Sequence, residues 1–326
     1  MIQGAQKTQV VGVDISFEET TYAIVDVRGN ILARDSFDTA DYPNIEDYVM
    51  KLCDSIMKLI EHNNSIEHIR SIGISAPSGN YLSGCIENSP NMPWRGVIPL
   101  AAMVRDRLGL AVALANDSHA VALGEQAFGS GHGLSNFGVV TIGYGLGSTI
   151  ISHGHVHTGA NGFAGELGHI CVVDNGRACG CGRLGCLESY VASSGIIRTA
   201  RELMAESEKA SLMRDLDRLS PKTIKDCCEL GDEMAIEVYR RTGYWLGVGL
   251  ANFATLLDPE AIILAGGVSQ AGRWLSEPAK DSFDNHVFHN IRGRVDLIIS
   301  QLSNRERDIL GASVLAWNVK EYSLFK

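Results

Sequence analysis

Three cysteines and a histidine stand close together near the middle of the chain, and their types suit metal binding. Cys179, Cys181 and Cys186 share one short stretch, and His169 lies a short loop upstream. Three thiolates and one imidazole form the closed tetrahedral ligand set of a structural zinc site. Glycines between the cysteines allow tight turns that point the sulfur atoms inward. The sequence therefore predicts a structural Zn²⁺ bound by these four residues.

Cysteine and histidine residues have other common uses in proteins. A Cys179–Cys181 disulfide would close a small, strained ring, and nothing indicates an oxidising compartment. His153, His155 and His157 alternate and would share one face of a strand, where they could bind metal, although such a set is more often a solvated face. Cysteines outside the cluster are expected to be buried thiols: Cys53, Cys85, Cys171, Cys227 and Cys228.

Two carboxylates, Glu166 and Glu188, bracket the cysteine cluster. A metal that pins the loop between them would fix both acids in space, which is a way to build a rigid polar site from a loop. Glu188 has a simpler interpretation as a solvated acid in the first turn of a helix, where the helix dipole stabilises it.

The elements that must position these residues follow an α/β pattern. Gln9–Ile15, Thr21–Val27 and Ile31–Phe37 are predicted to form an antiparallel meander, and Asn44–Glu61 has apolar residues at helical spacing. Ile69–Ser75 then completes a parallel crossover and leads into the loop that contains Gly79. The pattern also predicts three strands that are each followed by a polar or glycine-rich turn. These are Leu110–Ala115 followed by Asn116-Asp117, Phe137–Ile142 followed by Gly143–Gly147, and Ala261–Ala265 followed by Gly266-Gly267.

Further predicted strands are Ser148–Ser152 and Val295–Ser300. The predicted helices of the second half are Gly195–Glu206, Thr223–Glu229, Glu233–Leu256 and a final helix over about Arg307–Val319. Mixed strands followed by βαβ units occur twice, which indicates two α/β lobes. We place residues 1–115 and the C-terminal helix region 305–326 in the first lobe, and residues 116–304, with the zinc loop, in the second.

Composition and charge restrict the partners. The chain has 326 residues, 45% of them hydrophobic, and a net charge of −10, which disfavours general nucleic-acid binding. The N-terminus has no apolar signal core, and no stretch is long and apolar enough to span a membrane. We therefore expect a cytoplasmic protein that does not bind nucleic acid directly and does not associate with membranes.

The chain resembles the repressor–ORF–kinase (ROK) family of bacterial sugar kinases and sugar-responsive regulators, and within it the glucokinases of the Bacteroides type. The most specific likeness is Gly165-Glu166-Leu167-Gly168-His169 followed by the Cys179–Glu188 cluster. Other matches are Pro90-Asn91-Met92-Pro93-Trp94, Asn116-Asp117 and Ala265-Gly266-Gly267-Val268. The resemblance covers essentially the whole chain. It implies the two-lobed actin/hexokinase-like (ribonuclease H-like) fold, with a five-stranded mixed sheet in each lobe, a cleft between the lobes and a C-terminal helix packed on the first lobe.

The resemblance also implies roles for particular residues. Asp117 would be the general base that takes the proton of the attacking sugar hydroxyl. Sugar-hydroxyl ligands would be Gly79, Asn116, Asp117, Glu166, His169 and Glu188, with one ring nitrogen of His169 for the metal and the other for the sugar. Asp14 would hold Mg²⁺ or its water, and the turns with Gly143, Gly145, Gly147, Gly266 and Gly267 would bind ATP. Asn116-Asp117 could alternatively only cap the helix that follows. The family is often dimeric, and a homodimer is expected.

The nucleotide side departs from the family pattern. Asp-Ile-Gly-Gly-Thr is replaced by Asp14-Ile15-Ser16-Phe17-Glu18, Tyr144 stands where threonine is expected, and Thr149 where glycine is expected. A hydrogen bond to a charged group contributes roughly 1.5–3 kcal/mol, so losing two phosphate donors would cost about 3–6 kcal/mol, or roughly a hundred- to ten-thousand-fold in affinity or rate.

Two functions from different classes follow from these observations. The first is an ATP- and magnesium-dependent hexose kinase that uses Asp117 as its base. The second is a ROK protein with a decayed nucleotide site that binds a sugar as a sensor or regulatory module without kinase activity. The residues do not distinguish glucose from other hexoses, and they leave open whether His119 contacts the sugar.

Overall fold

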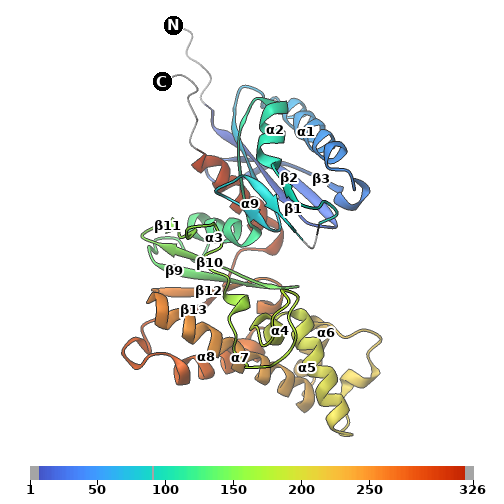
Figure 1. The fold of residues 1–326 in the computed structure, drawn as a ribbon, viewed down its shortest axis with the longest axis vertical. Helices are drawn as coiled ribbons and strands as arrows, with labels where there is room; N and C mark the ends of the chain where they lie inside the picture. Colours follow the sequence, from blue (N-terminus) through green and yellow to red (C-terminus); the bar gives the residue numbers. More distant parts are fainter. Residues whose placement is uncertain (1–6, 90–91, 320–326) are drawn as a thin grey trace. The chain divides into compact units, whose positions relative to one another are not determined.

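The computed structural model describes residues 7–89 and 92–319, so Pro90 and Asn91 of the family motif lie outside the described residues. The chain forms two compact units. Unit 1 contains the residues up to Gly133, Thr158–Ala164 and the residues from Gln301; unit 2 contains Leu134–His157 and Gly165–Ser300. Both units combine sheets with helices (Figure 1).

Unit 1 is built on a five-stranded sheet of order β3-β2-β1-β4-β8. The first three strands form the predicted antiparallel meander, and β4 and β8 add parallel to β1 and β4. A small antiparallel sheet, β5-β6-β7, follows β4 in the chain. The strands are β1 (Gln9–Ile15), β2 (Glu19–Asp26), β3 (Ile31–Asp38), β4 (Ile69–Ser75), β5 (Gly79–Asn80), β6 (Cys85–Glu87), β7 (Val97–Ile98) and β8 (Ala111–Ala115).

Helices cover both faces of the large sheet of unit 1. The alternation of β1 directs Val11 and Val13 into a core shared with α1 (Ile45–His62) and α2 (Leu100–Leu108), while Val10 packs with α9 (Asn304–Asn318) on the other face. The Asn44 side chain caps α1 by accepting two backbone N–H groups. Beside α9 lies α3 (Asp117–Phe128), so the C-terminal helix packs on the first unit, as the family resemblance implies (Figure 1).

Close backbone packing explains why α3 belongs to unit 1. A side chain at Gly311 of α9 would collide with the backbone at Ala120 of α3, and one at Gly12 of β1 would come within 2.7 Å of the Ile309 carbonyl. The glycines thus bring α9 against both β1 and α3. The compact units therefore divide after Gly133, whereas the sequence-based lobe boundary after residue 115 separates α3 from α9.

Unit 2 contains a second five-stranded sheet, of order β11-β10-β9-β12-β13. β9 and β10 form the predicted hairpin, and β12 pairs parallel to β9 and to β13. Helices pack against this sheet through one core that includes residues of α5, α7 and α8. The strands are β9 (Phe137–Ile142), β10 (Leu146–Ser152), β11 (His155–Val156), β12 (Ala261–Ala265) and β13 (Asp296–Ile299). The helices are α4 (Glu188–Val191), α5 (Ser193–Glu206), α6 (Pro221–Glu229), α7 (Glu233–Leu257) and α8 (Arg273–His286).

Helix ends in unit 2 follow local sequence signals. Asp232 caps α7 by accepting the N–H groups of Met234 and Ala235, and Asp258 ends it in a left-handed conformation. Ser220 and Thr223 form a capping box at the start of α6, with Pro221 at its first position. Short 3-10 turns are Thr39–Asp41, Leu167–His169, Leu212–Asp215, Val268–Ala271 and His289–Ile291.

Three sequence-based expectations need correction. His153 has a positive φ of 51° and turns the chain between β10 and β11, so the three alternating histidines do not share a strand. α8 was not predicted, because Pro278 inside it interrupts the helical pattern. Cys171 is exposed, whereas the other four cysteines outside the cluster are buried as expected. Within the described residues, no helix is long and apolar enough to cross a membrane.

Candidate functional site

The predicted metal ligands meet in unit 2. Within the described part of the chain, the one group that could hold a metal ion is His169, Cys179, Cys181 and Cys186, whose ligand atoms all lie within 4.8 Å of one another. The Sγ atoms of Cys181 and Cys186 are 3.7 Å apart, as are Cys179 Sγ and His169 Nδ1. Sulfur atoms bound to one tetrahedral zinc at about 2.3 Å would be about 3.8 Å apart. The donor set and its spacing therefore fit zinc.

The two ring nitrogens of His169 face different groups. Nδ1 faces the Cys179 sulfur, while Nε2 lies 3.9 Å from a carboxylate oxygen of Glu166. The imidazole and the Glu166 side chain are both partly accessible to solvent. Ser148 on β10 anchors the Glu166 turn, because its hydroxyl donates to the Gly165 carbonyl and accepts the Leu167 N–H. A metal ligand and a carboxylate thus occupy one short turn held by β10.

Glu188 begins α4 directly after the metal-ligand stretch. One of its carboxylate oxygens, Oε2, accepts the backbone N–H of Leu146 at 2.8 Å, and the other lies 3.8 Å from the Cys179 sulfur. The carboxylate therefore does more than act as a solvated first-turn acid of α4. It connects the metal-ligand loop to the start of β10.

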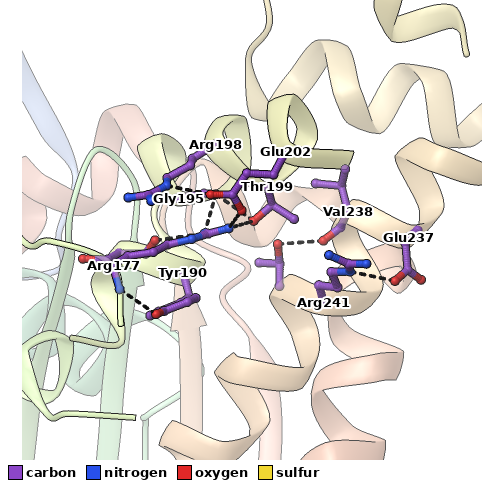
Figure 2. Close-up of polar contacts among 11 residues, drawn as sticks. Arg177, Tyr190, Gly195, Arg198, Thr199, Glu202, Glu237, Val238 and Arg241 are labelled. Atoms are coloured by element: carbon purple, nitrogen blue, oxygen red, sulfur yellow. Dashed lines mark hydrogen bonds and ion pairs between the residues drawn. The ribbon is translucent and has the colours of Figure 1, made fainter. Parts of the chain in front are cut away.

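Arg177 attaches the metal-ligand loop to α5, a role that sequence reasoning missed. Its guanidinium donates to the carbonyls of Ser189 and Gly195 and to the Thr199 hydroxyl, and it pairs with Glu202 (Figure 2). The same guanidinium lies 4.8 Å from the centre of the Tyr190 ring, a cation–π distance. Only 11% of the Arg177 side chain is exposed, so these interactions are largely desolvated.

The glycine-rich turn between β9 and β10 lies at the end of the unit 2 sheet. The Gly143 N–H donates to the Gly145 carbonyl, and the Tyr144 side chain stands in solvent, 84% exposed. Gly266, with a positive φ of 92°, lies so close to Ile142 that a side chain would collide with its backbone. The structure thus brings the two predicted nucleotide turns, Gly143–Gly147 and Gly266-Gly267, close together.

The first predicted phosphate loop is a tight turn between β1 and β2. The Ser16 N–H and hydroxyl both donate to the Glu19 carbonyl, and the Glu19 N–H returns a hydrogen bond to the hydroxyl. Phe17 is 51% exposed. Within the described residues, the N–H groups of Phe17 and Glu18 donate to no other part of the chain. The serine hydroxyl is therefore engaged inside the turn, while two backbone donors remain at its tip.

Asn116 and Asp117 stand where β8 ends and α3 begins. The Asn116 side chain caps α3 by accepting the Ser118 N–H at 2.8 Å. Asp117 Oδ1 accepts the same N–H at 2.8 Å, and the Asp117 side chain stays accessible. Gly79 lies against this corner, since a side chain there would come within 2.5 Å of the Ala115 carbonyl.

Acidic groups from three elements of unit 1 influence one another. Burial, followed by the negative charge of Asp308 on α9, raises the pKa of Asp14 to about 7. The pKa of Asp117 is also raised, mainly by loss of hydration and then by Asp308, while the Ser118 N–H opposes the rise. Water reaches the exposed Asp117 side chain and screens part of this effect. Sequence reasoning missed Asp308, which forms an ion pair with Arg307 at 2.9 Å.

His119 is a buried residue of α3 in the structure. Its side chain lies within the unit, and burial lowers its pKa to about 4. The imidazole is therefore neutral at neutral pH. Its burial favours a packing role over direct contact with a ligand.

The fold and site define a class of protein before any closer comparison. A mixed α/β chain with two five-stranded sheets has the two-lobed actin/hexokinase-like fold, which it shares with its structural neighbours. The chain belongs to the ROK family, whose model matches residues 10–319.

Individual relatives agree with this assignment. The glucokinase of Halalkalibacterium halodurans is 32% identical over 317 residues, which are 95% of this chain and 94% of the relative. A ROK family glucokinase from Streptomyces griseus, solved with glucose and AMPPNP, is also 32% identical, with a TM-score of 0.78 over 95% of this chain and 100% of the other. The xylose repressor of Bacillus subtilis is 25% identical over 90% of this chain and 73% of its own length. The finer likeness to glucokinases of the Bacteroides type stays a prediction.

Proposed function

We propose that the protein is an ATP- and Mg²⁺-dependent hexose kinase of the glucokinase kind. The observation that carries the proposal is the likeness to glucokinases along nearly the whole chain, including one solved with glucose and AMPPNP. The geometry within unit 2 supports it, because Glu188 lies beside the candidate metal ligands and the two glycine turns lie close together.

Each unit contains some of the hexose ligands that the family resemblance implies. Glu166, His169 and Glu188 lie on or beside the metal-ligand loop of unit 2, and Asn116 and Gly79 lie at the β8–α3 corner of unit 1. Each sugar hydroxyl both donates and accepts a hydrogen bond, so carboxylates, an imidazole and backbone groups suit it. A structural Zn²⁺ held by the three cysteines and His169 Nδ1 would keep the loop in one conformation.

Asp117 would act as the general base. Its raised pKa makes it a better proton acceptor than an ordinary aspartate. The carboxylate takes the proton of the attacking hydroxyl as the new oxygen–phosphorus bond forms and the bond to the ADP leaving group breaks. The Ser118 N–H holds the carboxylate in place.

The nucleotide would be held by backbone groups. The turns at Gly143–Gly147 and Gly266-Gly267 lie together, and the Ser16–Glu19 turn retains two N–H donors despite its altered side chains. Such donors suit phosphate oxygens. Asp14 would hold Mg²⁺ or its water, and a bound cation would offset the repulsion between its carboxylate and Asp308.

The direct test compares wild type with Asp117→Asn. A coupled assay of ADP release with Mg-ATP and a panel of hexoses should show turnover on at least one sugar. In Asp117→Asn, kcat should fall by roughly 10²–10⁴-fold, the usual contribution of general acid–base catalysis, while the Kd for the sugar stays within about twofold.

Asp106→Asn is the matched control, because Asp106 is an exposed carboxylate on α2 that pairs only with its neighbour Arg105 in the described structure. It should leave turnover unchanged. Unaltered turnover in Asp117→Asn would refute the assignment of the base.

A sugar sensor without kinase activity is a second candidate. The exposed Phe17 ring, the Glu18 carboxylate and the exposed Tyr144 ring stand on the turns that would hold phosphate, and a xylose repressor is among the relatives. This function predicts that a hexose raises the melting temperature while Mg-AMPPNP has no effect. Micromolar affinity for Mg-AMPPNP would exclude it.

A further inference from the structure

One short segment holds the glycine-rich turn at both of its ends. Ser193, the first residue of α5, donates two hydrogen bonds to the Gly143 carbonyl, from its N–H at 2.9 Å and from its hydroxyl at 2.6 Å. Glu188, five residues earlier in sequence, accepts the Leu146 N–H at 2.8 Å. The turn Gly143–Gly147 is therefore fastened to the segment 188–193, which follows directly on the metal ligand Cys186.

These hydrogen bonds determine the direction in which the backbone N–H groups of the turn point. The Gly143 carbonyl and the Tyr144 N–H belong to one planar peptide group and point in opposite directions. By binding the carbonyl, Ser193 turns the Tyr144 N–H away from α5. Within the described residues, the N–H groups of Tyr144 and Gly145 donate to nothing else, whereas those of Gly143 and Leu146 are occupied.

Steric contacts leave little freedom at the other end of the turn. A side chain at Gly145 would come within 2.7 Å of the Glu188 carboxylate, and one at Gly168 would collide with the Leu146 carbonyl. A side chain at Gly145 would force the Glu188 carboxylate to shift, whereas one at Gly168 would meet fixed backbone. The turn is thus held by Ser193 on one side and by Glu188 on the other, with two free N–H groups at its tip.

We propose that Ser193 is a positioning residue that aims the backbone N–H groups of the Gly143–Gly147 turn at the phosphates of the nucleotide. This proposal rests on the kinase function proposed above and deepens it. Backbone N–H groups are more important for phosphate binding in this chain, because Tyr144 stands where the family pattern has a threonine that would donate its hydroxyl. Preorganised donors bind an anion without first losing conformational freedom, so the hydroxyl of Ser193 contributes to affinity without touching the ligand.

Titration calorimetry with Mg-AMPPNP and, separately, glucose tests the role of Ser193. Ser193→Ala removes the hydroxyl but keeps the backbone N–H bond to Gly143. We expect Kd for Mg-AMPPNP to rise about fivefold, as for loss of one neutral hydrogen bond, with Kd for glucose unchanged. Ser193→Thr, which keeps a hydroxyl, should restore affinity to within about twofold. In steady-state kinetics, Ser193→Ala should raise KM for ATP without changing KM for glucose.

Ser194→Ala is the matched control, because Ser194 is the next residue of α5 and is exposed. It should bind Mg-AMPPNP as wild type does. Wild-type protein that binds glucose but not Mg-AMPPNP would overturn the kinase function and this inference with it. If wild type binds Mg-AMPPNP, equal affinity in Ser193→Ala overturns the inference alone. Parallel loss of glucose affinity or of folding in Ser193→Ala would also overturn it, because the hydroxyl would then be merely structural.

Discussion

At the scale of single residues, loss of hydration and then the negative charge of Asp308 raise the pKa of Asp117. Asp308 on α9 raises the pKa of both Asp14 and Asp117, although its own ion pair with Arg307 offsets part of its charge. A general base works best when its pKa lies closer to the working pH than that of a free aspartate. The placement of Asp308 therefore bears on the role proposed for Asp117.

Replacing Asp308 by asparagine should move the acid limb of the pH–rate profile to lower pH. Asp308→Asn removes a negative charge that raises the pKa of Asp117, and the positive charge of Arg307 remains. The base of the variant should then stay ionised at a pH where the wild-type base is protonated. kcat/KM for the hexose, measured between about pH 4 and pH 8, checks this direction.

The exposed carboxylate of Asp106 again gives a matched control, since Asp106→Asn should leave the acid limb in place. An acid limb that shifts to higher pH in Asp308→Asn, or that does not shift, would show that Asp308 does not act on the base.

At the scale of secondary structure, local patterns predicted most strands and helices, and they were wrong where an interior proline or a turn intervened. The antiparallel meander, the β9–β10 hairpin and α7 follow from period-2 or helical spacing and from caps that are local in sequence. α8 was missed because Pro278 hides its periodicity, and the strand expected through His153 is a turn.

The grouping of His169 with Cys179, Cys181 and Cys186 was predictable because these residues are close in sequence, whereas the contacts that support the loop were not. Arg177 is a single arginine in a loop, and its partners Thr199 and Glu202 lie on α5, where no sequence spacing connects them to it. Ser193 likewise gives no signal beyond a serine at a helix start. Such contacts form only when the tertiary structure brings α5 against the loop.

Replacing Arg177 should loosen the metal-ligand loop. Arg177→Met keeps much of the packing on Tyr190 but removes four hydrogen-bonded partners and leaves Glu202 with Arg198 alone (Figure 2). Breaking a buried ion pair costs about 3–5 kcal/mol, and because Glu202 is 38% exposed we expect about 2–3 kcal/mol. Urea unfolding would measure the loss, and a zinc-chelator competition should show faster metal release.

Arg241→Met offers a comparison within unit 2. Arg241 pairs with Glu237 and is 43% exposed, so its removal should cost at most about 1 kcal/mol and leave zinc release unchanged (Figure 2). Equal effects of the two substitutions would mean that Arg177 has no special part in holding the loop.

At the scale of the whole molecule, each unit has its own core and its own part of the proposed chemistry. Unit 1 is closed by α9, which returns from the end of the chain to lie by backbone contact against β1 and α3. Unit 2 contains the metal group and the two glycine turns on a separate core. The family resemblance predicted the fold, whereas the division after Gly133 depends on close helix packing that the sequence shows only as isolated glycines.

This division predicts where removal of the metal will act. Zinc binding adds free energy to the fold that organises its ligands, and all four ligands lie in unit 2. Hydrogen–deuterium exchange after treatment with a chelator should therefore rise in residues 169–191, which contain the ligands and α4, and stay unchanged in β1, β4 and α9. The part of the unit 2 core that lies on α5, α7 and α8 should keep most of its protection. Substitution of two exposed cysteines in the same loop distinguishes the effect of losing the metal from the effect of losing a thiol. Cys181→Ser should reduce the zinc content measured by mass spectrometry and reproduce the local rise in exchange, whereas Cys171→Ser, outside the ligand group, should keep one zinc per chain. Increased exchange throughout unit 1 would show that the metal stabilises the whole molecule, and equal zinc content in the two variants would refute the ligand assignment.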